Sequence, residues 1–106
     1  MSGHIIEWAP FRLKAGVSEA DLMRFSQELQ SGFLAKQNGF IRRELLKAAD
    51  GGYVDLVWWK SMAAAESAMA NAASSTFCSD YFSVMDADHD EPGAGVLTFH
   101  SIKTYT

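Results

Sequence analysis

The stretch from Gly39 to Met62, GFIRRELLKAADGGYVDLVWWKSM, contains the residues that decide the fold. Its apolar and aromatic runs predict two strands, at about 40–48 and 53–60. The Asp50-Gly51-Gly52 segment between them has the composition of a tight hairpin turn. Ser61 then has the side chain of a helix N-cap, so a helix should begin directly after the second strand.

Upstream of this hairpin, the sequence predicts one strand and one long helix. Residues 4–13, HIIEWAPFRL, are apolar and aromatic, and Pro10 restricts them to a sheet edge or a bulge. Ser18 followed by Asp21 approximates a capping box at the start of the helix. Its apolar face repeats at helical spacing, and the residues concerned are Leu22, Phe25, Leu29 and Phe33.

Downstream of the hairpin, the helix that begins at Ser61 is rich in alanine, so it can lie close to whatever it covers. A short further helix is expected around residues 77–85, after an interruption at 74–76. Residues 86–95 form a polar loop. Alternating side chains from Val96 to Tyr105 predict the last strand.

The predicted order is βαββαβ, which indicates an α+β domain over residues 1–106. Short connections and right-handed crossovers fold this order into a ferredoxin-like, four-stranded antiparallel sheet with two main helices on one face. The other face carries aliphatic and aromatic side chains and has no helix to cover it. An exposed apolar sheet of this kind predicts a homodimer with two sheets packed face to face.

Composition excludes several classes of protein. Hydrophobic residues make up 48% of the 106 residues, which is typical of a globular domain. The net charge of −4 and the lack of a basic stripe argue against nucleic-acid binding. No signal peptide or membrane span is apparent, and the single cysteine, Cys78, favours a reducing compartment. We therefore expect a cytoplasmic protein in which Cys78 is buried.

Several short segments resemble a known group of proteins. The strand ending PFRLKAG at residues 10–16, the Gly39-Phe40 pair and the Trp59–Met62 junction resemble those of the dimeric α+β barrel proteins, in the branch of antibiotic-biosynthesis monooxygenases. The resemblance implies a homodimer. It also implies a cofactor-free, monooxygenase-like enzyme that holds a hydrophobic or aromatic substrate between sheet and helices. A non-catalytic ligand-binding or structural homodimer is the alternative.

The resemblance implies which residues form the site. Trp59 would form a pocket wall, and Asp55, four residues earlier on the same strand face, takes the place of a polar residue in related oxygenases. Asp55 is therefore one candidate base. Many members carry a histidine on the second helix where this chain has Ala68. No predicted helix contains a histidine, which argues against haem degradation.

The hairpin register decides which arginine joins Trp59. A two-residue Asp50-Gly51 loop would pair Leu46 with Asp55 and Arg42 with Trp59. A three-residue loop through Gly52 would pair Lys47 with Asp55 and Arg43 with Trp59, giving a salt bridge and a cation–π contact. One residue of slip exchanges the two faces. We favour the second register and therefore Arg43.

Two of the remaining candidates lie outside the hairpin, and the third begins its second strand. Glu7 lies mid-strand among apolar neighbours and needs a partner, for which the arginines of the second strand are the nearest candidates. It would serve as an ion pair across the dimer or as a general base. His100 is the second candidate for proton transfer, because imidazole titrates near neutrality. Tyr53 completes the predicted substrate-binding set of Trp59, Arg43 and Glu7.

No metal or cofactor is expected. The D-x-D-x-D run at Asp86, Asp88 and Asp90 lacks the glycine and glutamate of a calcium-binding loop, since those positions hold Glu91 and Leu97. We interpret this run as a solvated acidic loop.

Overall fold

The computed structural model describes residues 3–86 and 96–106. Its elements confirm the predicted α+β order: β1 (Ile5–Phe11), α1 (Glu19–Gly32), a short 3-10 helix η1 (Leu34–Lys36), β2 (Phe40–Lys47), β3 (Tyr53–Trp59), α2 (Met62–Ala72), α3 (Thr76–Ser83) and β4 (Leu97–His100). The acidic run beyond Asp86 lies outside the described residues.

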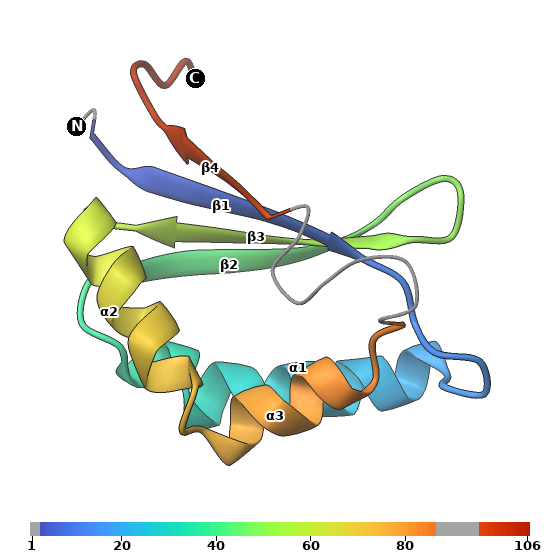
Figure 1. Ribbon diagram of the computed structural model, residues 1–106. Coiled ribbons are helices and arrows are strands. Elements are labelled where there is room, and N and C mark those ends of the chain that lie inside the picture. Colours follow the sequence, from blue (N-terminus) through green and yellow to red (C-terminus); the bar gives the residue numbers. More distant parts are fainter. Residues whose placement is uncertain (1–2, 87–95) are drawn as a thin grey trace.

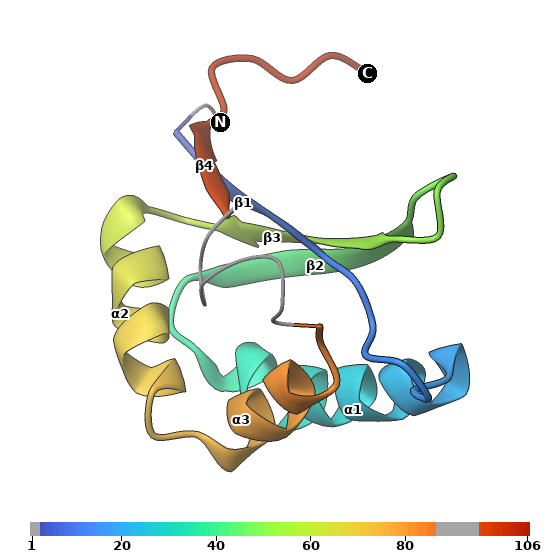
Figure 2. The same cartoon turned by 45° about the vertical axis from the view of Figure 1, so that its right-hand side comes forward.

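The sheet is antiparallel with strand order β2-β3-β1-β4, so β2 and β4 are its edges. The three α-helices of the described residues lie on one face of it (Figure 1). Figure 2 shows α1 and α3 side by side beneath the sheet, while α2 stands at the end where β3 leads into it. This is the predicted ferredoxin-like arrangement. Strand alternation points every second side chain into the space between the sheet and the helices.

Serine side chains begin all three α-helices. Ser18 and Asp21 form the predicted capping box, in which the Ser18 hydroxyl accepts from the Asp21 N–H and the Asp21 carboxylate accepts from the Ser18 N–H. Ser61 accepts from the Ala64 N–H and so starts α2 directly after β3. The Ser75 hydroxyl accepts from the Cys78 N–H and so starts α3. The helix starts therefore follow from local sequence.

The core lies between the sheet and α1 and α3. It is built from Leu22, Leu29 and Phe33 below and from Ile5, Val57 and Trp59 above, with Cys78 and Tyr81 contributed by α3. Cys78 is buried, as expected, and burial raises the pKa of its thiol. Ala65 and Ala68 bring α2 against this core.

The hairpin register differs from both predicted registers. The turn closes through a hydrogen bond of 2.7 Å from the Ala48 N–H to the Gly52 carbonyl. The loop therefore begins at Ala49, whereas both predicted loops begin at Asp50. Leu45 therefore lies opposite Asp55, and Arg43 lies opposite Val57. The same register would place Ile41 opposite Trp59, and an irregularity between Phe40 and Arg42 places Phe40 there instead, so no arginine faces Trp59.

The last strand is shorter than predicted, covering Leu97–His100 rather than Val96 to Tyr105. Its neighbour β1 begins at Ile5, and the final ladder bonds join Ser101 to Gly3 and His4. Beyond that point the chain has no strand to pair with. The C-terminal residues run away from the layers, on the side opposite the helices (Figure 1), and Ile102 and Tyr105 are almost fully exposed.

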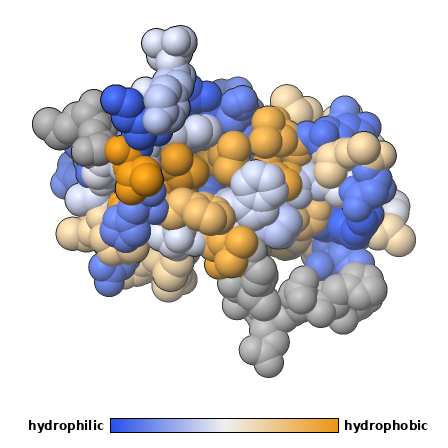
Figure 3. Space-filling model, turned by 90° about the horizontal axis from the view of Figure 1, so that it is seen from above, coloured by the Kyte–Doolittle hydropathy of each residue, from blue (hydrophilic) through white to orange (hydrophobic). Residues whose placement is uncertain are grey.

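The open face of the sheet is largely apolar, as predicted. Figure 3 looks down on this face and shows hydrophobic side chains gathered across its middle. The strand pairing assigns the following residues to it: Ile6, Trp8, Leu56, Trp58, Leu97 and Phe99. Arg42 lies on the same face, with its guanidinium 4.3 Å from the centre of the Trp58 ring. The described helices leave this face uncovered.

Gly39 joins the helix layer to the sheet and has no tolerance for a side chain. Its φ of +83° is a left-handed conformation that L residues avoid, and an added Cβ would lie 2.5 Å from the Ala64 Cβ on α2.

We expect Gly39→Ala to lower the melting temperature well beyond the strain cost alone. Gly51→Ala is the matched control, because Gly51 has φ +90° and open space around its Cα. The control should lose about 1–2 kcal/mol. Equal losses in thermal unfolding would show that the Ala64 contact is unimportant.

Candidate functional site

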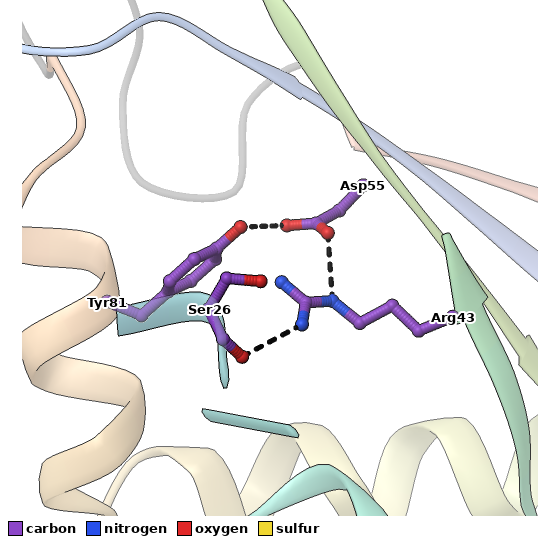
Figure 4. A network of polar contacts seen from close by, with 4 residues as sticks. All are labelled: Ser26, Arg43, Asp55 and Tyr81. Carbon is purple, nitrogen blue, oxygen red and sulfur yellow. Dashed lines mark hydrogen bonds and ion pairs between the residues drawn. The ribbon is translucent and has the colours of Figure 1, made fainter. Parts of the chain in front are cut away.

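A buried ion pair occupies the middle of the space between sheet and helices. Arg43 donates from Nε to Asp55 Oδ1 at 2.9 Å, and the two side chains are only 6% and 9% exposed. The Tyr81 hydroxyl donates to Asp55 Oδ2 at 2.6 Å, and Arg43 Nη1 donates to the Ser26 carbonyl at 3.2 Å (Figure 4). The cluster thus ties β2 and β3 to both α1 and α3.

The network favours one protonation pattern. Burial, followed by the nearby negative charge of Asp55, raises the pKa of Tyr81 far above its ordinary value. Tyr81 therefore keeps its proton and donates a hydrogen bond to the Asp55 carboxylate. The Arg43 guanidinium also lies 5.2 Å from the centre of the Tyr81 ring, a cation–π contact. Among buried side-chain atoms of the described residues, Arg43 Nη2 alone lacks a hydrogen-bond partner.

This cluster has the properties of a structural element. Both oxygens of Asp55 are engaged, its side chain is buried, and it does not line the groove described below. A carboxylate enclosed in this way is satisfied by its partners and has no open approach for a substrate. Arg43 is indeed the enclosed arginine, whereas its predicted contact with Trp59 and the predicted Lys47–Asp55 bridge were wrong.

A second polar contact lies nearer the other end of β3. The Trp59 indole donates from Nε1 to Glu7 Oε1 at 2.6 Å. Trp59 itself is buried, and Phe40 meets it edge to face at 5.8 Å. The expected pairing of Glu7 with the strand-two arginines was wrong within this chain, because β1 lies between β3 and β4 and does not adjoin β2. A short hydrogen bond to a carboxylate fixes the orientation of Glu7.

Glu7 also borders an open groove between α2 and the edge of the sheet. The groove has a volume of about 310 Å³ and is lined by Glu7, Met62, Ala65, Glu66, Met69 and Thr98. The α2 residues recur at the spacing of one helix face, and Thr98 lies opposite Glu7 on β4. Its size is at the lower end of the range for small-molecule sites. The groove therefore combines apolar side chains with two carboxylates and one hydroxyl.

The remaining predicted site residues, Tyr53 and His100, lie apart from both contacts and from the groove lining. Tyr53, at the far end of β3, donates its hydroxyl to Glu19 Oε1 at 2.8 Å, and this acceptor raises the pKa of Tyr53. Lys47 also pairs with Glu19, at 2.9 Å. His100 is exposed on β4 and lies opposite Ile5, on the same sheet face as Glu7 but outside the groove lining. The predicted site is thus divided into three places along β3 and a fourth on β4.

Sequence reasoning missed Tyr81, Ser26 and the methionines of α2. Tyr81 lies within the short helix expected around residues 77–85, and nothing in its spacing links it to Asp55. The groove residues could have been found, because Met62, Ala65, Glu66 and Met69 recur at i, i+3, i+4 and i+7. A glutamate on such an apolar stripe is the signal that was overlooked.

No model of a protein family matches the sequence, and no curated protein matches it. Solved structures do match. The cofactor-independent oxygenase SnoaB from Streptomyces nogalater aligns over 99% of this chain and 97% of its own, with 17% identity and a TM-score of 0.70. A putative antibiotic biosynthesis monooxygenase from Bordetella bronchiseptica aligns over 97% and 99%, with 15% identity and a TM-score of 0.71. The chain has the fold of the antibiotic biosynthesis monooxygenase-like proteins.

The same fold is shared by a heme-degrading protein from Mycobacterium tuberculosis, with 15% identity, a TM-score of 0.59, and coverage of 97% of this chain and 99% of that one. At these identities the likeness is one of fold. Within the residues that the structure describes, no helix carries a histidine and no three metal-binding side chains cluster. Nor is any helix in those ranges both long and apolar enough to cross a membrane.

Proposed function

We propose that this protein is a cofactor-independent, monooxygenase-like enzyme that binds a hydrophobic or aromatic substrate in the groove beside α2, with Glu7 as the general base. The observation that carries the proposal is the position of Glu7. Its carboxylate borders the groove and is oriented by the buried Trp59 indole. Asp55 and His100 are the alternative bases, but neither lines the groove.

The groove residues suit the deprotonation of an activated C–H group. Glu7 would take the proton, and the Thr98 hydroxyl would donate a hydrogen bond to the oxygen on which negative charge develops. The resulting enolate transfers electrons to dioxygen and forms a carbon-bound hydroperoxide. Loss of water then leaves a new carbonyl group, so one ketone and one dioxygen yield one quinone and one water. The substrate supplies all the electrons for this reaction.

The test is oxygen uptake with anthrone, a three-ring ketone that forms such an enolate. The wild-type protein should increase uptake above the uncatalysed rate. Ala65→Leu should reduce the increase at least several-fold, because Ala65 lines the groove and a larger side chain would fill it. A melting curve must show that the variant is folded, because Ala65 also packs against the core. Ala63→Leu is the control, since Ala63 is exposed on α2 and does not line the groove. Equal rates for these two variants, or no increase for the wild type, would contradict the proposal.

We also propose that two copies associate through the open sheet face. The face carries two tryptophans and Phe99, and cores of protein interfaces are enriched in aromatic residues and arginine. The segment that follows β4 lies on the same side (Figure 1), and its side chains Ile102 and Tyr105 are exposed. A second copy of this chain presents the same apolar face, and a two-fold interface is formed by the same surface patch on both copies. We therefore commit to a second copy as the partner.

Phe99→Glu should convert the dimer to a monomer in sedimentation experiments, because it would place two charges inside an apolar interface. Phe82→Glu provides the control. Phe82 is similarly exposed, at 56% against 47%, but lies on α3 in the opposite layer. A wild-type monomer, or a Phe99→Glu variant that remains dimeric, would refute this interface.

A further inference from the structure

The groove is negatively charged without a compensating cation. Glu7 and Glu66 contribute two carboxylates, while none of its lining residues is lysine, arginine or histidine. Several other carboxylates of the described chain are paired: Glu19 with Lys47, Glu44 with Arg42 and Asp50 with Arg12. Neither groove glutamate forms a salt bridge with the residues that the structure describes.

We propose that the ligand of this groove is a protonated amine attached to an aromatic or apolar body, and that Glu66 pairs with its ammonium group. The inference rests on the proposed function, because it concerns the same groove and names its substrate class. Glu7 remains the base, and Glu66 determines which charge the groove accepts.

The placement of Glu66 supports this assignment. It follows Met62 by four residues and precedes Met69 by three, so all three side chains share one face of α2. The two thioethers are polarizable and make favourable contacts with aromatic rings. An aromatic body lying along the methionines would place its head group beside the Glu66 carboxylate. Ala65 leaves room for that body between them.

Charge should then discriminate between ligands of equal shape. Two carboxylates attract an ammonium group, leave a neutral alcohol unaffected and repel a carboxylate. Because Glu66 is exposed, solvent and salt screen its effect, so the preference should be modest at physiological ionic strength and larger at low salt.

The test uses three compounds that share one ring system and differ in charge: 2-naphthylmethylamine, 2-naphthylmethanol and 2-naphthoate. Binding is measured by NMR titration of the methionine methyl groups at low ionic strength and neutral pH. The amine should bind about two- to five-fold more tightly than the alcohol, and the carboxylate should bind most weakly. Added salt should reduce the difference. The shifts should concentrate on Met62 and Met69.

Glu66→Gln should remove most of the preference for the amine and leave the affinity for the alcohol unchanged. Glu28→Gln is the control, because Glu28 is an exposed residue of α1 outside the groove, and this variant should behave as the wild type. Equal affinities of the wild type for amine and alcohol would overturn the charge assignment and leave the groove itself intact. No binding by any of the three compounds would overturn both the assignment and the groove as a ligand site.

Discussion

Arg43→Ala is expected to lower the free energy of unfolding by about 3–5 kcal/mol, the typical cost of removing one partner from a buried ion pair. The variant would leave Asp55 buried with Tyr81 as its remaining hydrogen-bond donor. It would also remove the donor that binds the Ser26 carbonyl and so ties β2 to α1. For a domain of this size the melting temperature should fall by more than about 12 °C.

Arg12→Ala is the matched control for this measurement. Arg12 also forms a salt bridge, with Asp50 at 2.7 Å, but the two side chains are 52% and 66% exposed. Solvent-exposed pairs contribute about 0–1 kcal/mol, so the control should change stability little. Chemical denaturation of both variants measures the difference. Equal losses would mean that the Arg43–Asp55 pair contributes no more than a surface contact.

A double variant separates the ion pair from the space it fills. Arg43→Met combined with Asp55→Leu replaces both charges with apolar side chains and leaves no unpaired charge in the core. Because such replacements are often neutral or stabilising, the double variant should be more stable than Arg43→Ala. A double variant less stable than Arg43→Ala would show that the polar network itself, including Tyr81, is required for packing.

Glu7→Gln is expected to reduce kcat/KM by about 10²–10⁴, the usual contribution of a general base. The amide oxygen can still accept the hydrogen bond from Trp59 Nε1, so the side chain should keep its position and the fold its stability. What the variant loses is the ability to take a proton. The measurement is oxygen uptake with anthrone, accompanied by a melting curve.

One further variant tests the alternative base His100, and a second, at Glu28, is the control for a carboxylate outside the groove. His100→Gln and Glu28→Gln should retain activity, since neither residue lines the groove. An unchanged rate for Glu7→Gln would remove Glu7 from the mechanism. A loss in His100→Gln instead would transfer the role of base to the histidine on β4.

Much of the fold could be predicted because its signals are local. Ser18 with Asp21 and Ser61 with the Ala64 N–H form caps within one turn of their own helices. Helical spacing of apolar residues and strand alternation likewise need only neighbouring residues. The four strands and the covered and open faces of the sheet followed from these signals and from the right-handedness of crossovers.

The candidate site was predicted less well because its contacts are long-range. Trp59 and Glu7 are far apart in the sequence, and only the pairing of β1 with β3 brings them together. Tyr81 reaches Asp55 from α3, whose position depends on the packing of two helices. Within one chain Glu7 cannot pair with the strand-two arginines, because β3 lies between β1 and β2, while an ion pair of Glu7 across a dimer stays a prediction.

The sequence by itself determined the order of elements, the helix starts and an amphipathic sheet, because caps and periodicity act over a few residues. Within the stretch from Gly39 to Met62 it also limited the enclosed arginine to two candidates. Only the tertiary structure decided between them. The hydrogen bond between Ala48 and Gly52 closes the turn and places Arg43 and Asp55 on the helix-covered face. Because side chains alternate with a period of two, this one turn also directs Arg42 to the open face.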